Sequence, residues 1–109
     1  MNENTDQELF YLRVRQTGNE YLVAICDRPL LGETICEGET ELFVNENFFG
    51  GKLAPLDDCL KEMSQATSFN LIGNKIVLAA IEARLIHEFA VLWINTAKFG
   101  RVGHVMFVR

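Results

Sequence analysis

Apolar and polar residues alternate at the start of the chain with the period of two that is typical of a β-strand with one buried face. This pattern covers residues 8–16, and a second apolar run follows at residues 21–26. The connection at residues 17–20 has the sequence Thr-Gly-Asn-Glu, which favours a tight turn. The two strands are therefore predicted to form an antiparallel hairpin.

The period changes after Pro55, where apolar side chains recur every three or four residues. Proline suits the first turn of a helix, and Asp57 and Asp58 lie where the positive end of the helix dipole favours acids. This pattern predicts a helix that begins at Pro55 and ends near Ser68.

A second helix is predicted to begin at Asn70 or Asn74 and to finish at residues 85–87. Gly73 fits either a break between the two helices or a close helix contact. Asn70 stands among apolar neighbours, where an amide is costly to bury unless it is hydrogen-bonded. It therefore either caps the second helix or points into a recognition cleft.

Three further strands complete the predicted fold. Residues 41–45 form the third strand, and the last two are residues 89–95 and 102–108, which are rich in β-branched and aromatic residues. Five strands and two central helices, in the order β-β-β-α-α-β-β, predict an α+β fold with a mostly antiparallel sheet. Residues 1–7 read as a flexible leader.

The length of 109 residues is that of one domain, so residues 1–109 are expected to form a single domain. Every apolar run is shorter than the roughly 20 residues that a membrane-spanning helix needs. The first residues lack the basic start and the apolar segment of a signal peptide. We therefore expect a cytoplasmic protein without a membrane partner.

The net charge of −5 is distributed unevenly. Residues 1–62 carry 13 acidic and 5 basic residues, whereas residues 63–109 carry 2 acidic and 5 basic residues. Phosphate backbones repel an acidic protein, so DNA is not expected as a partner, although a local basic face can dock on RNA. Ordinary unevenness of a solvated surface is the alternative interpretation. The candidate RNA contacts are Arg13, Arg15, Lys98, Arg101 and Arg109.

Neither a metal-binding motif nor a redox motif is present in the sequence. Cys26, Cys36 and Cys59 are too widely spaced to form a Cys-x-x-Cys pair, and we expect reduced thiols. Four glutamates within residues 33–41 do not match the spacing of a calcium loop, which favours a solvated acidic face. We expect no metal and no cofactor, and the sequence favours a protein that is not an enzyme.

The two histidines and the aromatic residues near the end of the sequence give weaker indications of a functional site. His87 lacks the second histidine of the zinc protease motif and is expected at a helix end, whereas His104 is expected on a strand face. Trp93, Phe99 and Arg101 could stack on RNA bases, but a core position for Trp93 is the simpler interpretation.

Residues 47–51 have the sequence Asn-Phe-Phe-Gly-Gly. Gly50 and Gly51, followed by lysine, superficially suggest a phosphate-binding loop, but the P-loop spacing is missing and Pro55 intervenes before any helix. A tight turn that places one of the two phenylalanines in the core is the preferred interpretation. The same turn, together with Asn70, could instead form one wall of a small-molecule pocket.

Three segments carry a family resemblance: the run Leu22–Asp27, the Phe-Phe-Gly-Gly turn at residues 48–51, and the Asn-Leu-Ile-Gly segment at residues 70–73. Together they resemble the archaeal family called Domain of Unknown Function 424. The resemblance covers residues 10–94 and implies a small cytoplasmic protein of unassigned activity, in the company of translation genes. It points to Gly50, Gly51, Asn70 and Gly73 without defining their roles.

Three hypotheses on function follow. The first is a non-enzymatic interaction module, associated with translation, that docks on RNA or protein through the basic residues named above. The second is a small-molecule-binding protein or enzyme with a pocket near the Gly50-Gly51 turn and Asn70. The third is a homodimer that pairs exposed strand edges across a two-fold axis.

Overall fold

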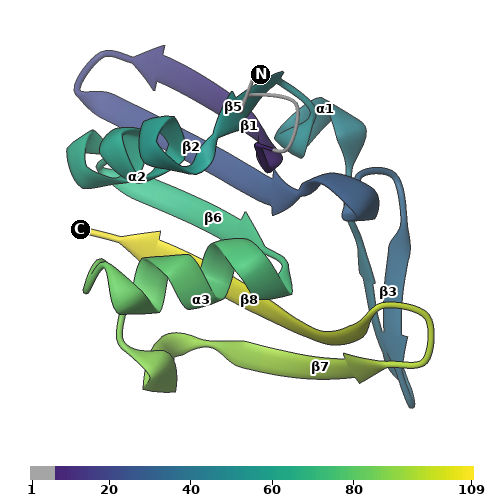
Figure 1. Ribbon diagram of the computed structural model, residues 1–109. Coiled ribbons are helices and arrows are strands. Elements are labelled where there is room, and N and C mark those ends of the chain that lie inside the picture. Colours follow the sequence, from purple (N-terminus) through teal and green to yellow (C-terminus); the bar gives the residue numbers. More distant parts are fainter. Residues whose placement is uncertain (1–6) are drawn as a thin grey trace, which may run out of the picture.

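The computed structural model describes residues 7–109 and is built on a mixed six-stranded sheet (Figure 1). The strand order is β5-β1-β2-β6-β8-β7, and all neighbours are antiparallel except β2 and β6, which are parallel. The strands are β1 (Leu9–Thr17), β2 (Glu20–Asp27), β5 (Lys52–Pro55), β6 (Ser68–Ile72), β7 (Leu92–Thr96) and β8 (Gly100–Val108). The predicted leader, residues 1–7, lies outside the described residues apart from Gln7.

Within residues 7–109, a separate hairpin and five short helical segments surround this sheet. The hairpin consists of β3 (Thr34–Glu37) and β4 (Thr40–Phe43). The α-helices are α1 (Glu46–Phe49), α2 (Leu56–Gln65) and α3 (Asn74–Glu82), and the 3-10 helices are η2 (Arg28–Leu30) and η3 (Glu88–Ala90). In Figure 1, α2 and α3 lie in front of the sheet, and the β3–β4 hairpin stands at its right-hand end. No helix within residues 7–109 is long and apolar enough to cross a membrane.

The two faces of the sheet are covered to different extents. On one face, α2 and α3 pack on the larger core, which includes Phe10, Ile25, Met63, Phe69 and Ile76. On the opposite face, a second cluster gathers under η2, the β3–β4 hairpin and α1, with the buried side chains of Ala24, Cys26, Leu30, Ile35, Val44, Phe49, Ile72, Ile94 and Val102. The remainder of that second face carries no helix.

The predicted α+β class is confirmed, but the predicted sheet is wrong in detail. The sheet has six strands and one parallel pair, and the described residues contain three α-helices rather than two. The two hairpins expected from alternation and turn chemistry are present as β1–β2 and β7–β8. The short elements β3, α1 and β5 were not predicted. The third predicted strand, residues 41–45, overlaps β4, which pairs with β3 outside the main sheet.

The prediction that Asn70 caps the second helix is wrong, because Asn70 lies at the centre of strand β6. β6 is hydrogen-bonded between β2 and β8, and this pairing satisfies its backbone on both sides. The helix begins at Asn74 and ends at Glu82, before residues 85–87, where its end was predicted. Arg84 has a φ of 63°, a left-handed conformation that ends the helical path.

The three cysteines are free thiols and differ in accessibility. Burial raises the pKa of the Cys26 and Cys59 thiols to about 12, whereas Cys36 is exposed on β3. Because the thiolate is the reactive form, a brief treatment of the folded protein with a maleimide should modify Cys36 alone. Mass spectrometry checks this, with the urea-unfolded protein as the control that takes three labels. A second label on the folded protein would contradict the buried positions.

Candidate functional site

The face of the sheet opposite α2 and α3, which α1 covers in part over β1 and β2, carries a regular array of side chains. Strand register aligns Arg13, Ala24, Asn70 and Met106 in one row across β1, β2, β6 and β8. The next row contains Arg15, Leu22, Ser68 and Val108. Side chains in alternate positions of a strand share a face, so both rows point away from α2 and α3. We call this surface the open face.

A hydrogen-bonded pair of side chains lies on the open face, between β6 and β8. The Nε2 atom of His104 is 3.1 Å from Oδ1 of Asn70. An amide oxygen only accepts, so Nε2 carries the ring proton and donates it to Asn70. Burial lowers the pKa of His104, which favours the neutral imidazole. The pair therefore carries no charge near neutral pH.

A cavity of about 400 Å³ opens beside this pair. Its apolar walls come from the β3–β4 hairpin, α1 and the sheet: Leu42, Phe43, Phe48, Phe49, Ile72 and Met106. Its polar lining consists of Asn45, Asn70 and His104. The Oδ1 atom of Asn45 accepts a hydrogen bond from the backbone N–H of Asn47 and caps α1. The amide Nδ2 of Asn45, together with Asn70 and His104, remains as a polar group that a ligand can meet.

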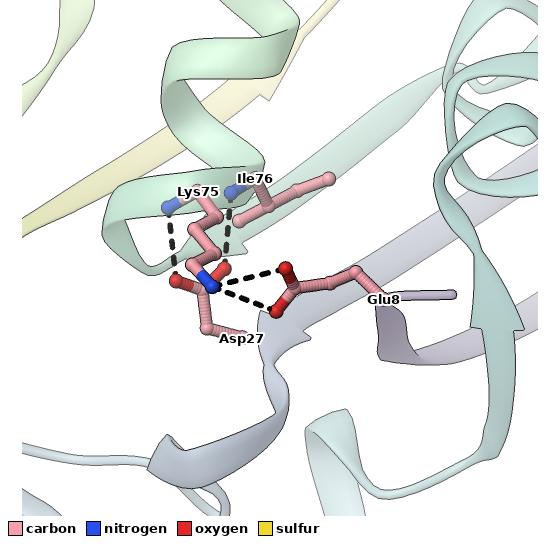
Figure 2. Close-up of polar contacts among 4 residues, drawn as sticks. All are labelled: Glu8, Asp27, Lys75 and Ile76. Carbon is pink, nitrogen blue, oxygen red and sulfur yellow. Dashed lines mark hydrogen bonds and ion pairs between the residues drawn. The ribbon is translucent and has the colours of Figure 1, made fainter. Parts of the chain in front are cut away.

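Gly73, the second residue singled out in the Asn-Leu-Ile-Gly segment, has a structural role. Its φ of 141° is a conformation that residues with a Cβ rarely adopt. Figure 2 shows the carboxylate of Asp27 beside the first turn of α3, where it accepts hydrogen bonds from the backbone N–H groups of Lys75 (2.9 Å) and Ile76 (3.0 Å). A Cβ at Gly73 would overlap this carboxylate. Gly73 is therefore the residue that lets Asp27 cap α3.

Asp27 is 8% exposed and is the buried charged residue of the described chain. Burial raises the pKa of its carboxyl, and the two backbone donors and Lys75 only partly offset this. The Lys75 ammonium lies 2.9 Å from Glu8, as Figure 2 also shows. A hollow of about 270 Å³ adjoins these groups, but Asp27 already accepts from two backbone N–H groups, and Lys75 already pairs with Glu8. Asp27 was not predicted as a cap, because the sequence places it 48 residues before Lys75.

Gly50 and Gly51 lie at the end of α1 and do not line the cavity beside Asn70. A Cβ at Gly51 would overlap the backbone of Leu12 on β1, and a Cβ at Gly50 would overlap the carbonyl of Glu46. These glycines allow the chain to pass close to β1 between α1 and β5. The prediction that one phenylalanine of this segment enters the core is confirmed by Phe49, which is 6% exposed.

The five candidate RNA contacts are not gathered in one patch. Arg13 donates to the carbonyl of Gly50 (2.7 Å), and Arg15 donates to the carbonyls of Asn47 and Phe48. These carbonyls close α1, so the two guanidinium groups bind the negative end of that helix. Arg15 also stacks on the ring of Phe48, which lines the cavity, so this guanidinium group lies close to the cavity on the open face.

The other three basic residues lie away from the open face. Lys98 pairs with Glu33 at 3.3 Å, and Arg101 covers the ring of Trp93 with its guanidinium carbon 3.9 Å from the centroid. Arg109 donates to the carbonyl of Ala66, at the end of α2. Trp93 is half-buried, and Arg101 occupies the ring face on which a base would stack.

Other candidate chemistry is satisfied within the fold. Glu37 accepts a hydrogen bond from the backbone N–H of Asn95 on the edge strand β7, and no group of three or more metal-ligating side chains is found within residues 7–109. Another hollow, of about 580 Å³, lies at the end of α3 and includes His87. His87 Nδ1 already accepts from the backbone N–H of Phe89. The cavity beside Asn70 is therefore the candidate functional site.

Fold and site together define a small α+β domain that has an uncharged cavity on one face of a mixed sheet. The chain belongs to the family described as "Protein of unknown function (DUF424)", which matches residues 14–105. This confirms the family resemblance found in the sequence. The crystal structure of an uncharacterized conserved protein from Methanopyrus kandleri is similar in fold, with a TM-score of 0.69 and 24% identity over 91% of this chain and 90% of that chain. No curated protein matches this chain.

Proposed function

We propose that the protein is a non-enzymatic binding module whose ligand enters the cavity between Asn70 and His104. The observation that carries this proposal is a cavity of about 400 Å³ with mainly apolar walls and a few polar groups, the usual composition of a small-molecule site. Neither a carboxylate nor a cationic side chain lines it. Nucleophilic catalysis would also need a hydroxyl or thiol beside a base, and the lining contains neither, with His104 as its titratable group.

Docking on RNA is the second candidate function. It is favoured by the position of Arg13 and Arg15 beside the open face, where Phe48 connects them to the cavity. Glu37, Glu39 and Glu41 belong to the β3–β4 hairpin, the element that also supplies Leu42 and Phe43 to the cavity, and acidic side chains repel phosphate. The association with translation rests on the family resemblance alone. Ligand binding in the cavity therefore has the stronger geometric support.

A cavity-blocking variant tests the proposal. Met106 lines the cavity and is 72% exposed, whereas Val108 lies two residues further along the same strand, is 78% exposed and does not line it. Met106→Trp should abolish the binding of compounds found in a nuclear magnetic resonance screen of neutral and charged small molecules. Val108→Trp should leave their binding unchanged, and both variants should unfold at the same temperature as the original protein.

Chemical-shift changes on binding should centre on Asn70, His104 and Phe48. Equal loss of binding in both tryptophan variants, or shifts centred on another surface, would overturn the proposal. Fluorescence anisotropy with a short single-stranded RNA at low salt tests the second function. RNA binding that resists Met106→Trp and weakens steeply with salt would favour docking through the basic residues.

A further inference from the structure

We propose that the cavity takes an uncharged, planar ring compound whose amide or lactam carbonyl accepts a hydrogen bond from the side chain of Asn70. This inference rests on the proposed function and names the chemical class of the ligand. It follows from three properties of the lining: a free donor, the absence of charge, and aromatic walls.

The free donor that the sheet contributes to the cavity is the Nδ2 amide group of Asn70, whereas the other lining amide, that of Asn45, belongs to the cap of α1. The Oδ1 atom of Asn70 accepts from Nε2 of His104, whereas its Nδ2 donates to no acceptor within residues 7–109. No buried side-chain nitrogen or oxygen atom in that part of the chain lacks a partner, so Nδ2 is accessible from the cavity rather than sealed in the core. A primary amide has two N–H donors, and a carbonyl oxygen of the ligand is their natural acceptor.

The absence of charge excludes ionic ligands. Neither Arg, Lys, Asp nor Glu lines the cavity, and burial keeps His104 neutral at pH values where a free histidine is partly protonated. A phosphate, carboxylate or ammonium group would lose its hydration without gaining an opposite charge. A neutral acceptor such as an amide carbonyl loses far less hydration free energy on entering the cavity.

The walls favour a flat apolar body. The rings of Phe48 and Phe49 lie edge to face, with centroids 4.9 Å apart and an interplanar angle of 80°. Met106 on β8 also lines the cavity, and its flexible thioether makes favourable contacts with aromatic rings. Aromatic faces and edges at this angle suit a planar ring, and nucleobases, which combine such a ring with a lactam edge, belong to this class.

Three probes of similar size separate these properties in a titration followed by nuclear magnetic resonance. Uracil is neutral and carries lactam carbonyls, orotate is the same ring with an added carboxylate, and toluene lacks an acceptor. Uracil should bind at least about tenfold more tightly than either of the others, because one charge or one missing hydrogen bond costs about that factor. Orotate or toluene binding as tightly as uracil would overturn the ligand class while leaving the binding module intact.

Asn70→Leu removes the donor and keeps the branching of the side chain at Cγ. Uracil affinity should fall about tenfold in this variant, whereas toluene should bind no more weakly than before, which also shows that the cavity is still formed. An unchanged uracil affinity would overturn the role of Asn70. Should the variant fail to fold, the ¹⁵N chemical shifts of the His104 ring in the unsubstituted protein test the proposal. A proton on Nδ1 instead of Nε2 would mean that Asn70 Nδ2 donates to His104 and is not free, which would contradict the proposal.

The proposed ring can come from a free heterocycle or from an unpaired base in RNA, and a comparison of two ligands separates these sources. An octamer of uridylate that binds more tightly than uracil, with shifts at Asn70 and His104, would identify the ligand as an unpaired base in RNA. Tighter binding of free uracil would identify a free heterocycle. If no member of the full compound screen binds, the proposed function falls together with the ligand class.

Discussion

Gly73→Ala is expected to lower the free energy of unfolding by about 3–5 kcal/mol. The backbone at Gly73 has a φ of 141°, which strains any residue with a Cβ. The added methyl group would also push the carboxylate of Asp27 away from the N–H groups of Lys75 and Ile76. Urea denaturation followed by circular dichroism measures the change in stability.

Gly18→Ala is the matched control for this prediction. Gly18 has a φ of 58° in the turn between β1 and β2, and a Cβ there would meet no atom within 4 Å. Replacing Gly18 by alanine should therefore destabilise the protein by about 1 kcal/mol, which is the cost of a left-handed conformation for a residue with a Cβ. If Gly73→Ala were no more destabilising than Gly18→Ala, the cap that Asp27 forms on α3 would not require the absence of a Cβ at residue 73.

Asp27→Ala is expected to cost about 2–4 kcal/mol, because it removes the acceptor of two N–H groups, one of them buried, at the start of α3. Asp57→Ala is the control, since Asp57 lies exposed in the first turn of α2 and acts only on the helix dipole. Its replacement should cost less than about 1 kcal/mol. Similar losses in the two variants would contradict the capping role of Asp27.

The pH dependence of stability gives an independent measure of Asp27. Its pKa is raised in the folded protein, so between the unfolded value, about 3.9, and the folded value the native state binds more protons than the unfolded state. The free energy of unfolding therefore falls as pH rises through this window. Asp27→Asn should remove this slope, and the cost of that variant should be largest below the unfolded pKa, about 3.9. A cost that grows as pH rises would mean that the folded pKa is lowered instead.

Local patterns were sufficient to predict the two hairpins and the body of α2. Strand alternation and a turn of two residues fix β1–β2 without help from the rest of the chain, and the 3.6-residue period after Pro55 fixes α2. The family motif likewise pointed to Asn70 and Gly73 before any geometry was known. Their different roles follow only from the fold.

The segment Ser68–Ile72 shows why the remainder was not predictable from local sequence. Its polar and apolar residues alternate, which is a strand signal, but the stretch is short and asparagine is a strong capping residue. Pairing with β2 and β8 decides the outcome, and both partners are distant in sequence. The same pairing brings His104 to Asn70, so the site could not be assembled from either residue alone.

The parallel pair β2–β6 also bears on the order in which the chain folds. Residues 28–67 separate its two strands, and closing so long a loop is costly before the final contacts form. We expect the hairpins β1–β2 and β7–β8 to form early and the centre of the sheet to close late. Asp27 reaches α3 only when β6 has joined β2. Its cap would then restrain unfolding more than it accelerates folding, which makes the link between β2 and α3 a determinant of the lifetime of the native state.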